Sequence, residues 1–231
     1  MTDAPVIDIA RIPFSRYGSY LSICHDSANH QLAVHHVWRR FEDYAFTLSF
    51  SARGATPAWT ASATPWALRI ASDAGEARLY IKDDSSCVLE SRGLDVRLSR
   101  ADPGVYGVEE SAGRFKIISQ PQCTYAHVRV FHGKGKLDGP HLPLNKQSAM
   151  RRNHRSDLSV VCEDDRIVMQ LDIANRERRA RETPPLIERD LETVRREWEA
   201  FCSGMPEIPL ERRPHALLAW YNLWSYFVRA T

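Results

Sequence analysis

The sequence lacks the compositional extremes that identify several classes of protein. Its 231 residues contain 31 Lys and Arg against 29 Asp and Glu, which leaves a formal net charge of only +2. Because the positive and negative charges nearly balance, the chain creates no strong electrostatic field that would attract nucleic acid or an anionic membrane. No window approaches the roughly 18 apolar residues of a membrane-spanning helix, and residues 1–14 lack the basic and apolar blocks of a signal peptide. We therefore expect a cytoplasmic protein that binds neither nucleic acid nor membrane.

Cysteine is scarce and unpaired in the sequence. The five cysteines are Cys24, Cys87, Cys123, Cys162 and Cys202. Their odd number, wide spacing and lack of any CxxC motif argue against a disulfide framework and against a cysteine metal site. Buried, reduced thiols are the favoured interpretation, which agrees with a cytoplasmic location.

Motifs of known catalytic chemistry are also missing. There is no GxSxG, and no Ser or Cys lies in a recognisable nucleophile context. Segment 132–141 resembles a phosphate loop superficially, but it lacks the GxxxxGK[ST] spacing and a following helix, so we predict a flexible loop. His30, His35 and His36 are close in sequence, yet neighbours on a strand face opposite ways, which disfavours zinc. We expect no metal and no cofactor.

Clusters of like charge are predicted to be solvated rather than catalytic. The acidic pairs are Asp83-Asp84, Glu109-Glu110 and Asp164-Asp165. Each pair coincides with a predicted turn, and this favours exposed loops over a general acid and base. The basic run 151–157 lacks the interleaved aromatic residues of a nucleic-acid stacking platform, so we expect an exposed loop or a patch of ion pairs.

What the sequence does contain, up to about residue 175, is a series of short apolar runs separated by turn signals. Apolar and polar residues alternate with a period of two in segments 79–82 and 127–130, as in half-buried strands. No helical pattern intervenes, so about ten or more strands in antiparallel sheets are expected. Sheets of this kind bury their apolar faces against each other. The pattern therefore predicts a large, supersandwich-like antiparallel β-sandwich.

Two helices are predicted after the strands, so the fold class is mainly β with two C-terminal α-helices. The charged connector 175–185 leads to a helix that Thr183 caps, with Pro184 and Pro185 in its first turn. Apolar residues of this helix recur at helical spacing: Leu191, Val194, Trp198 and Phe201. Ser203-Gly204 ends it.

The second helix has Pro214 in its first turn and is apolar on nearly every side. Its polar residues share one stripe: His215, Asn222, Ser225 and Arg229. The stripe either faces a polar groove or meets solvent and caps nearby carbonyls. Such an apolar helix needs a surrounding shell, from earlier residues or from another chain.

Segment 12–23 is the other distinctive stretch. Arg16 and two aromatic residues surround Gly18 between apolar flanks. Glycine permits a bulge or a turn with positive φ, which would display Arg16 at the edge of a sheet. The alternative is an ordinary bend between two strands.

Segments 12–23 and 212–231, together with the order of parts along the chain, resemble the N-terminal portion of the six-hairpin glycosidases. These glycoside hydrolases, of glucoamylase, trehalase and debranching type, carry an (α/α)6 catalytic barrel. The resemblance implies a sandwich domain at residues 1–178, a helical linker at 179–211 and the first barrel helix at 212–231. It also implies that the chain is a piece of such an enzyme, and that the barrel lies in another domain or chain.

The resemblance further implies the activity and the binding residues. The assembled enzyme would hydrolyse glycosidic bonds, with α-glucosides as the expected substrates, through one carboxylate that protonates the leaving oxygen and one that activates water. No carboxylate of this chain matches that pair, so the chain alone is expected not to be catalytic. The residues expected to contribute to a sugar-binding rim are Arg16, Tyr17, Tyr221, Asn222 and Trp224.

Two other functions fit the same residues. A freestanding carbohydrate-binding sandwich could dimerise through its C-terminal helices, so that a second copy completes the apolar shell. Alternatively, a sandwich enzyme could act by itself on a sugar or a small ester, which would require a cleft with a perturbed carboxylate or histidine.

Overall fold

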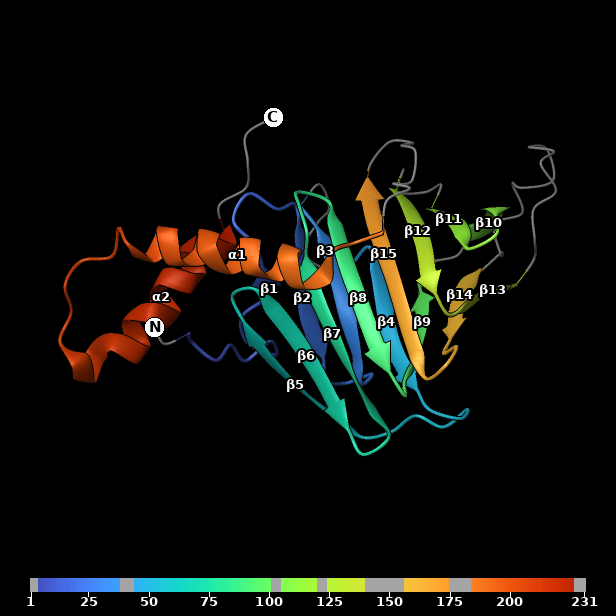
Figure 1. Ribbon diagram of the computed structural model, residues 1–231, viewed down its shortest axis with the longest axis horizontal. Helices are drawn as coiled ribbons and strands as arrows, with labels where there is room; N and C mark the ends of the chain where they lie inside the picture. The colour runs from blue at the N-terminus through green and yellow to red at the C-terminus, as the bar shows by residue number, and fades with distance from the viewer. Residues whose placement is uncertain are drawn as a thin grey trace.

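The fold is mainly β, with two packed antiparallel sheets followed by two helices, which confirms the predicted class (Figure 1). This computed structural model describes residues 4–37, 44–100, 105–119, 124–139, 156–174 and 184–226.

The first sheet has seven strands. In spatial order they are β1 (Phe14–Ser15), β2 (Leu21–Asp26), β3 (Gln31–His36), β4 (Phe46–Ser51), β9 (Asp95–Ser99), β14 (Asp157–Val161) and β13 (Lys134–Asp138). The first four are neighbours both in sequence and in space, as hairpin-linked strands usually are. β9 and β14 then join from distant parts of the chain.

The second sheet has eight strands. In spatial order they are β10 (Val105–Ser111), β11 (Arg114–Ser119), β12 (Thr124–His132), β15 (Arg166–Ala174), β8 (Ser86–Arg92), β7 (Gly75–Ile81), β6 (Ala67–Ser72) and β5 (Trp59–Thr64). The central pair, β15 and β8, again joins segments that are distant in sequence, with Met169 opposite Leu89.

The core lies between the two sheets and follows from the period-two pattern. Leu79 of β7 pairs with Leu89 of β8, and both side chains are buried. From the seven-stranded sheet, Leu48 and Leu98 pair in register and belong to the same hydrophobic cluster. Alternate residues point away from this core, so each sheet also has an outer face.

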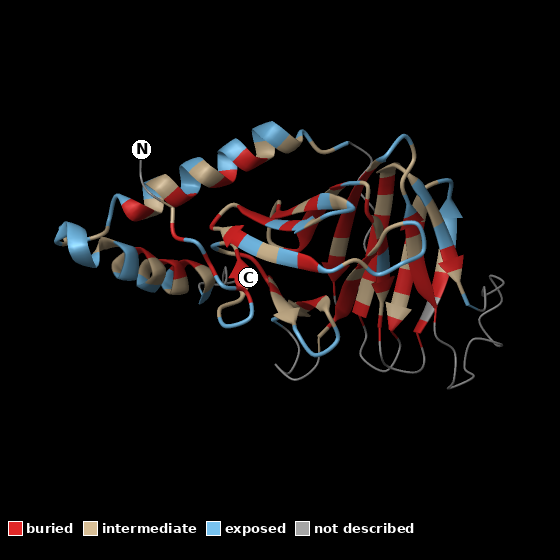
Figure 2. Ribbon diagram, turned by 90° about the horizontal axis from the view of Figure 1, so that it is seen from below, coloured by how far each residue is buried: buried red, intermediate tan, exposed pale blue. Residues whose placement is uncertain are grey.

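α1 (Ile187–Cys202) lies on the outer side of the eight-stranded sheet, whereas α2 (Arg213–Tyr226) lies beside β1 at the end of the sandwich, and both helices reach past that end (Figures 1 and 2). The C-cap of α1 is Ser203, where the sequence predicts the end of the helix. Its N-cap is Leu186, whose side chain makes no capping hydrogen bond. Pro184 and Pro185 therefore precede the helix rather than forming its first turn, and Thr183 lies outside the described residues. A single turn of 3-10 helix, η1 (Leu210–Arg212), leads directly into α2 (Arg213–Tyr226), whose first turn contains Pro214 as expected.

A second, smaller apolar cluster forms where α1 crosses the sheet. Leu191 of α1 packs with Ala67, Tyr80 and Val88 from the outer face of β6, β7 and β8. This cluster explains why Ala67, Tyr80 and Val88 are buried although they face away from the core between the sheets. α1 is therefore part of the sandwich's packing.

Two sequence predictions are wrong, one at β13 and one at β10. Segment 134–138 is the strand β13 rather than a loop. Its glycine serves close packing and not flexibility, because a Cβ at Gly135 would come within 2.3 Å of the Phe115 ring. Glu109 and Glu110 lie in β10, at an irregularity in its pairing with β11, rather than in a turn. Glycine and charge made both strands look like loops.

Candidate functional site

Arg16, Tyr17, Tyr221 and Trp224, four of the predicted rim residues, meet where β1 contacts the two helices. The contact begins with the turn between β1 and β2, where Gly18 has a φ of 78°. A turn with positive φ was one of the conformations that the sequence permitted at this glycine, and it lets the chain reverse within a few residues. The reversal places residues 16 and 17 against the helices.

Arg16 is not displayed at the sheet edge, contrary to expectation. Its guanidinium pairs with the carboxylate of Glu197 on α1, with Nη2–Oε2 and Nε–Oε2 distances of 2.6 and 3.0 Å. Nη1 of Arg16 also donates to the carbonyl oxygens of Ile81 and Lys82 at the end of β7. The guanidinium thus joins β1, β7 and α1, and the side chain is only 13% exposed.

Tyr221 joins α2 to β1 through its hydroxyl group. The oxygen accepts a hydrogen bond from the backbone N–H of Ser15 at 2.9 Å and donates one to the carbonyl of Pro13 at 3.0 Å. The residue is fully buried, and burial raises the pKa of its hydroxyl above the usual value, so the proton is retained. A side chain engaged in this way has no surface left for a sugar.

Trp224 belongs to an aromatic cluster that holds α1 and α2 together. Its ring lies edge-on to Trp198 at a centroid distance of 5.5 Å and packs against Phe201 at 5.3 Å. Tyr17 contacts the same cluster, with its ring centroid 5.7 Å from that of Trp224. Trp224 is buried, whereas Tyr17 is 51% exposed. Tyr17 is therefore the most exposed residue of this aromatic cluster.

Asn222, the fifth predicted residue, is half-buried on the flank of α2, and its carbonyl accepts a hydrogen bond from Ser225. The solvent-facing stripe of α2 is a different one. It consists of His215, Ala219, Leu223 and Tyr226. Arg229, the last member of the predicted polar stripe, lies outside the described residues. Of the predicted polar residues, His215 lies within this exposed stripe, whereas Asn222 and Ser225 border it.

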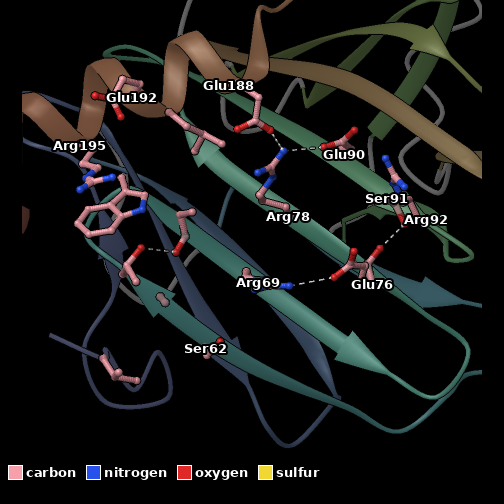
Figure 3. Close-up of a pocket in the computed structure, with 16 residues that line it drawn as sticks. Ser62, Arg69, Glu76, Arg78, Glu90, Ser91, Arg92, Glu188, Glu192 and Arg195 are labelled. Carbon is pink, nitrogen blue, oxygen red and sulfur yellow. Dashed lines mark hydrogen bonds and ion pairs between the residues drawn. The ribbon is translucent and has the colours of Figure 1, made fainter. Parts of the chain in front are cut away.

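A cleft of about 610 Å³ lies between α1 and the outer face of β5 to β8 (Figure 3). Its charged lining comprises Arg69, Arg78, Arg92, Arg195, Glu76, Glu90, Glu188 and Glu192. Within the part of the chain that the structure describes, every one of these glutamates has an arginine partner. The cleft is thus lined by ion pairs, and one of them, Arg78–Glu188, joins the sheet to the helix.

Glu90 is the most enclosed carboxylate of this network. Burial would raise its pKa, but hydrogen bonds from Arg78 and Arg166 outweigh that effect and lower the pKa below its ordinary value. A general acid needs the opposite, a pKa raised far enough to keep the proton at neutral pH. The cleft therefore has its most buried carboxylate in the wrong protonation state for a glycosidase acid.

The residues that dock α1 were missed in the sequence. Outward-facing Tyr80 of β7 and Lys82, which directly follows β7, both reach Asp190: Tyr80 Oη donates to its carboxylate at 2.9 Å, and Lys82 Nζ lies 3.5 Å away. Arg78, two residues earlier on the same face, pairs with Glu188 at 2.6 Å. A signal for this contact was present in the sequence. Hydrogen-bond donors at alternate positions, 78, 80 and 82, are complementary to the two acidic residues in the first turn of α1.

The four described cysteines are free thiols that are poorly suited to nucleophilic chemistry. Burial raises the pKa of Cys24 above the usual value, that of Cys87 to about 12, and those of Cys162 and Cys202 to about 11. These thiols are therefore protonated at neutral pH. Cys123 lies outside the described residues.

In the described ranges, no group of three or more His, Cys, Asp or Glu residues is arranged to hold a metal ion. No helix in those ranges has both the length and the apolarity needed to cross a membrane. A scan against models of known protein families gives no match, and a search of curated proteins gives none either.

Proposed function

We propose that this chain is the non-catalytic N-terminal part of a glycoside hydrolase, whose α2 packs on an (α/α)6 catalytic barrel carried by another domain or chain. The assembled enzyme hydrolyses glycosidic bonds, with α-glucosides as the first substrates to test. It works in the cytoplasm, where its thiols remain reduced.

The two-sided character of α2 is the observation that carries this proposal. Leu217, Tyr221 and Trp224 form the buried stripe that faces α1 and β1. On the opposite side, Leu223 and Tyr226 are 46% and 72% exposed. They are three residues apart, so they share a face of the helix. A helix that is apolar on two opposite sides suits a position between two layers.

A helical barrel is the partner whose packing matches this surface. α2 reaches past the sandwich, and its exposed stripe combines small Ala219 with larger Leu223 and Tyr226. Residues spaced by three and four along a helix form the ridges that pack into the grooves of another helix. The resemblance of segments 12–23 and 212–231 to six-hairpin glycosidases names the same partner.

The chain itself supplies position rather than chemistry in this proposal. Tyr17 is the rim residue with an accessible aromatic face on which a sugar ring can stack. Arg16, Tyr221 and Trp224 hold that face in place through the contacts described above, and half-buried Asn222 lies beside it. The acid and base carboxylates come from the barrel.

Native and denaturing mass spectrometry of the protein purified from its own cells is the direct test. The expected result is a barrel-sized catalytic part, continuous with the chain or bound to it, that hydrolyses maltoheptaose or p-nitrophenyl α-glucoside. The sandwich and its two helices, produced alone, should hydrolyse neither substrate. Leu223→Asp should weaken association with the barrel, because it places a charge in an apolar contact.

Val161→Asp is the matched control, since Val161 is 47% exposed but lies on β14, away from the helices. It should leave association unchanged. A lone monomer, or a homodimer that Leu223→Asp dissociates, would overturn the barrel proposal and favour the freestanding binding module. Equal effects of the two substitutions would show that α2 is not the docking surface.

A further inference from the structure

A polar groove of about 720 Å³ crosses the outer face of the seven-stranded sheet. It is lined by Asn29, Gln31, Tyr44, Thr47, Ser49, Arg97, Ser99 and Asp157. The face is opposite to the one that α1 covers, so the groove is separate from the proposed barrel contact. Nothing in the proposed function uses it.

Small polar side chains form the floor of the groove. Thr47 and Ser49 point outward from β4, and they pair in register with Ser99 and Arg97 of β9. The hydroxyls of Ser49 and Ser99 have no hydrogen-bond partner in the described part of the chain. Each can therefore both donate and accept a hydrogen bond with a ligand.

Among the described residues that line the groove, the one cation, Arg97, is neutralised. Arg97 Nη2 lies 2.6 Å from Oδ2 of Asp157, and Arg97 Nε donates to the same oxygen at 3.2 Å. Asp157 is nearly buried, whereas half of the arginine side chain remains accessible. The pair presents donors without net charge, so an anion such as phosphate gains little from it.

Amide and aromatic groups border the floor. The side-chain nitrogens of Asn29 and Gln31 donate to Oδ2 of Asp26 at 2.8 and 3.0 Å, which orients both amides. Their carbonyl oxygens have no partner among the described residues. Tyr44 is half-buried, stands edge-on to His35 and has an unpartnered hydroxyl in the same part of the chain.

We infer that this groove binds a neutral oligosaccharide. An open site with hydroxyl groups on its floor, amide groups at its border, no net charge among its described lining residues and one aromatic ring matches a sugar, which has many hydroxyls and one apolar ring face. An apolar ligand would leave these polar groups unpaired, which is costly. A peptide strand would add at β1 or β13, the edges of the sheet, rather than on its face.

Calorimetric titration of the protein with maltoheptaose, cellohexaose and xylohexaose tests the inference. We expect one of these probes to bind. Tyr44→Ala should weaken that binding by up to about ten-fold, since it removes the stacking face. Ser49→Met, which fills the floor with an outward-pointing side chain, should abolish it. Tyr125→Ala, which truncates a half-buried tyrosine on the outer face of the other sheet, is the matched control and should leave binding unchanged.

Unfolding temperatures of all variants establish that each is folded. Failure of all three sugars to bind the wild-type protein would overturn the inference. Loss of binding in Tyr17→Ala but not in Tyr44→Ala would also overturn it, while it would support the rim at β1 and α2. Loss in Tyr44→Ala alone supports the groove whether or not a barrel partner exists, so the two proposals fail separately.

Discussion

Replacement of Tyr221 by Phe removes a single oxygen atom from the contact between α2 and β1. That oxygen accepts from Ser15 N and donates to Pro13 O, and the ring around it is completely buried. Phe keeps the ring and its packing. The substitution therefore leaves a backbone N–H and a backbone carbonyl inside the protein without their partner.

The expected cost follows from this desolvation. A buried polar group that loses its partner destabilises a protein by about 1–3 kcal/mol, and we expect about 2 kcal/mol here because one donor and one acceptor are affected. For a chain of this size, about 2 kcal/mol lowers the unfolding temperature by roughly 4–8 °C.

Urea denaturation followed by tryptophan fluorescence measures this difference, because the Trp198 ring lies 6.2 Å from that of Tyr221 and also packs against Trp224. Tyr226→Phe is the control, since Tyr226 is largely exposed and should change stability by less than about 0.5 kcal/mol. Equal midpoints for Tyr221→Phe and Tyr226→Phe would refute the argument that this hydroxyl holds α2 to the sheet.

Three further predictions concern other contacts. Arg16→Gln should destabilise the protein by about 2 kcal/mol and Glu197→Gln by about half as much. The reason is that Arg16 is enclosed and has three partners, whereas Glu197 is partly exposed. Equal losses of stability in urea titrations would contradict this asymmetry. Because the folded protein lowers the pKa of Glu90, ionised Glu90 stabilises the fold. This stability is fully present above the pKa of the unfolded chain, about 4.3, and is lost as the pH falls through the pKa of the folded protein. Glu90→Gln should flatten the dependence of the unfolding temperature on pH below about 5, and an unchanged slope would argue against the ion pairs. Gly135→Ala should lower the free energy of unfolding by about 1–3 kcal/mol, because the added methyl group overpacks the contact with Phe115. Gly204→Ala is the control and should be tolerated, because the nearest neighbour of its Cβ would be Phe201 O at 3.7 Å. Similar calorimetric traces for the two variants would show that β13 is not packed as described.

The elements themselves could be read from local patterns. Alternation in segments such as 79–82 produced strands because a sheet between core and solvent needs opposite characters on its two faces. Helical spacing of Leu191, Val194 and Trp198 identified α1 for the corresponding reason. The approach was wrong at β13 and at Glu109-Glu110 of β10, where glycine and charge are normal turn signals.

The candidate site was only partly predictable. Arg16 and Tyr221 were selected as residues of a type that binds sugars, but the same donors and rings also serve to join elements. A sequence does not say which polar group is satisfied internally. The polar groove was not predicted, because Ser49, Arg97 and Asp157 come from three strands that are distant in the chain.

The sequence by itself determined the class of this protein: a chain with alternating strands, then one amphipathic helix and one apolar helix. Only the tertiary structure decided which side chains remain available for a ligand. Arg16 meets Glu197 across 181 residues, and Tyr221 meets Ser15 across 206. Local periodicity specifies which face of an element is apolar, but it carries no information about which distant element will cover that face, because that choice depends on the packing of the whole chain.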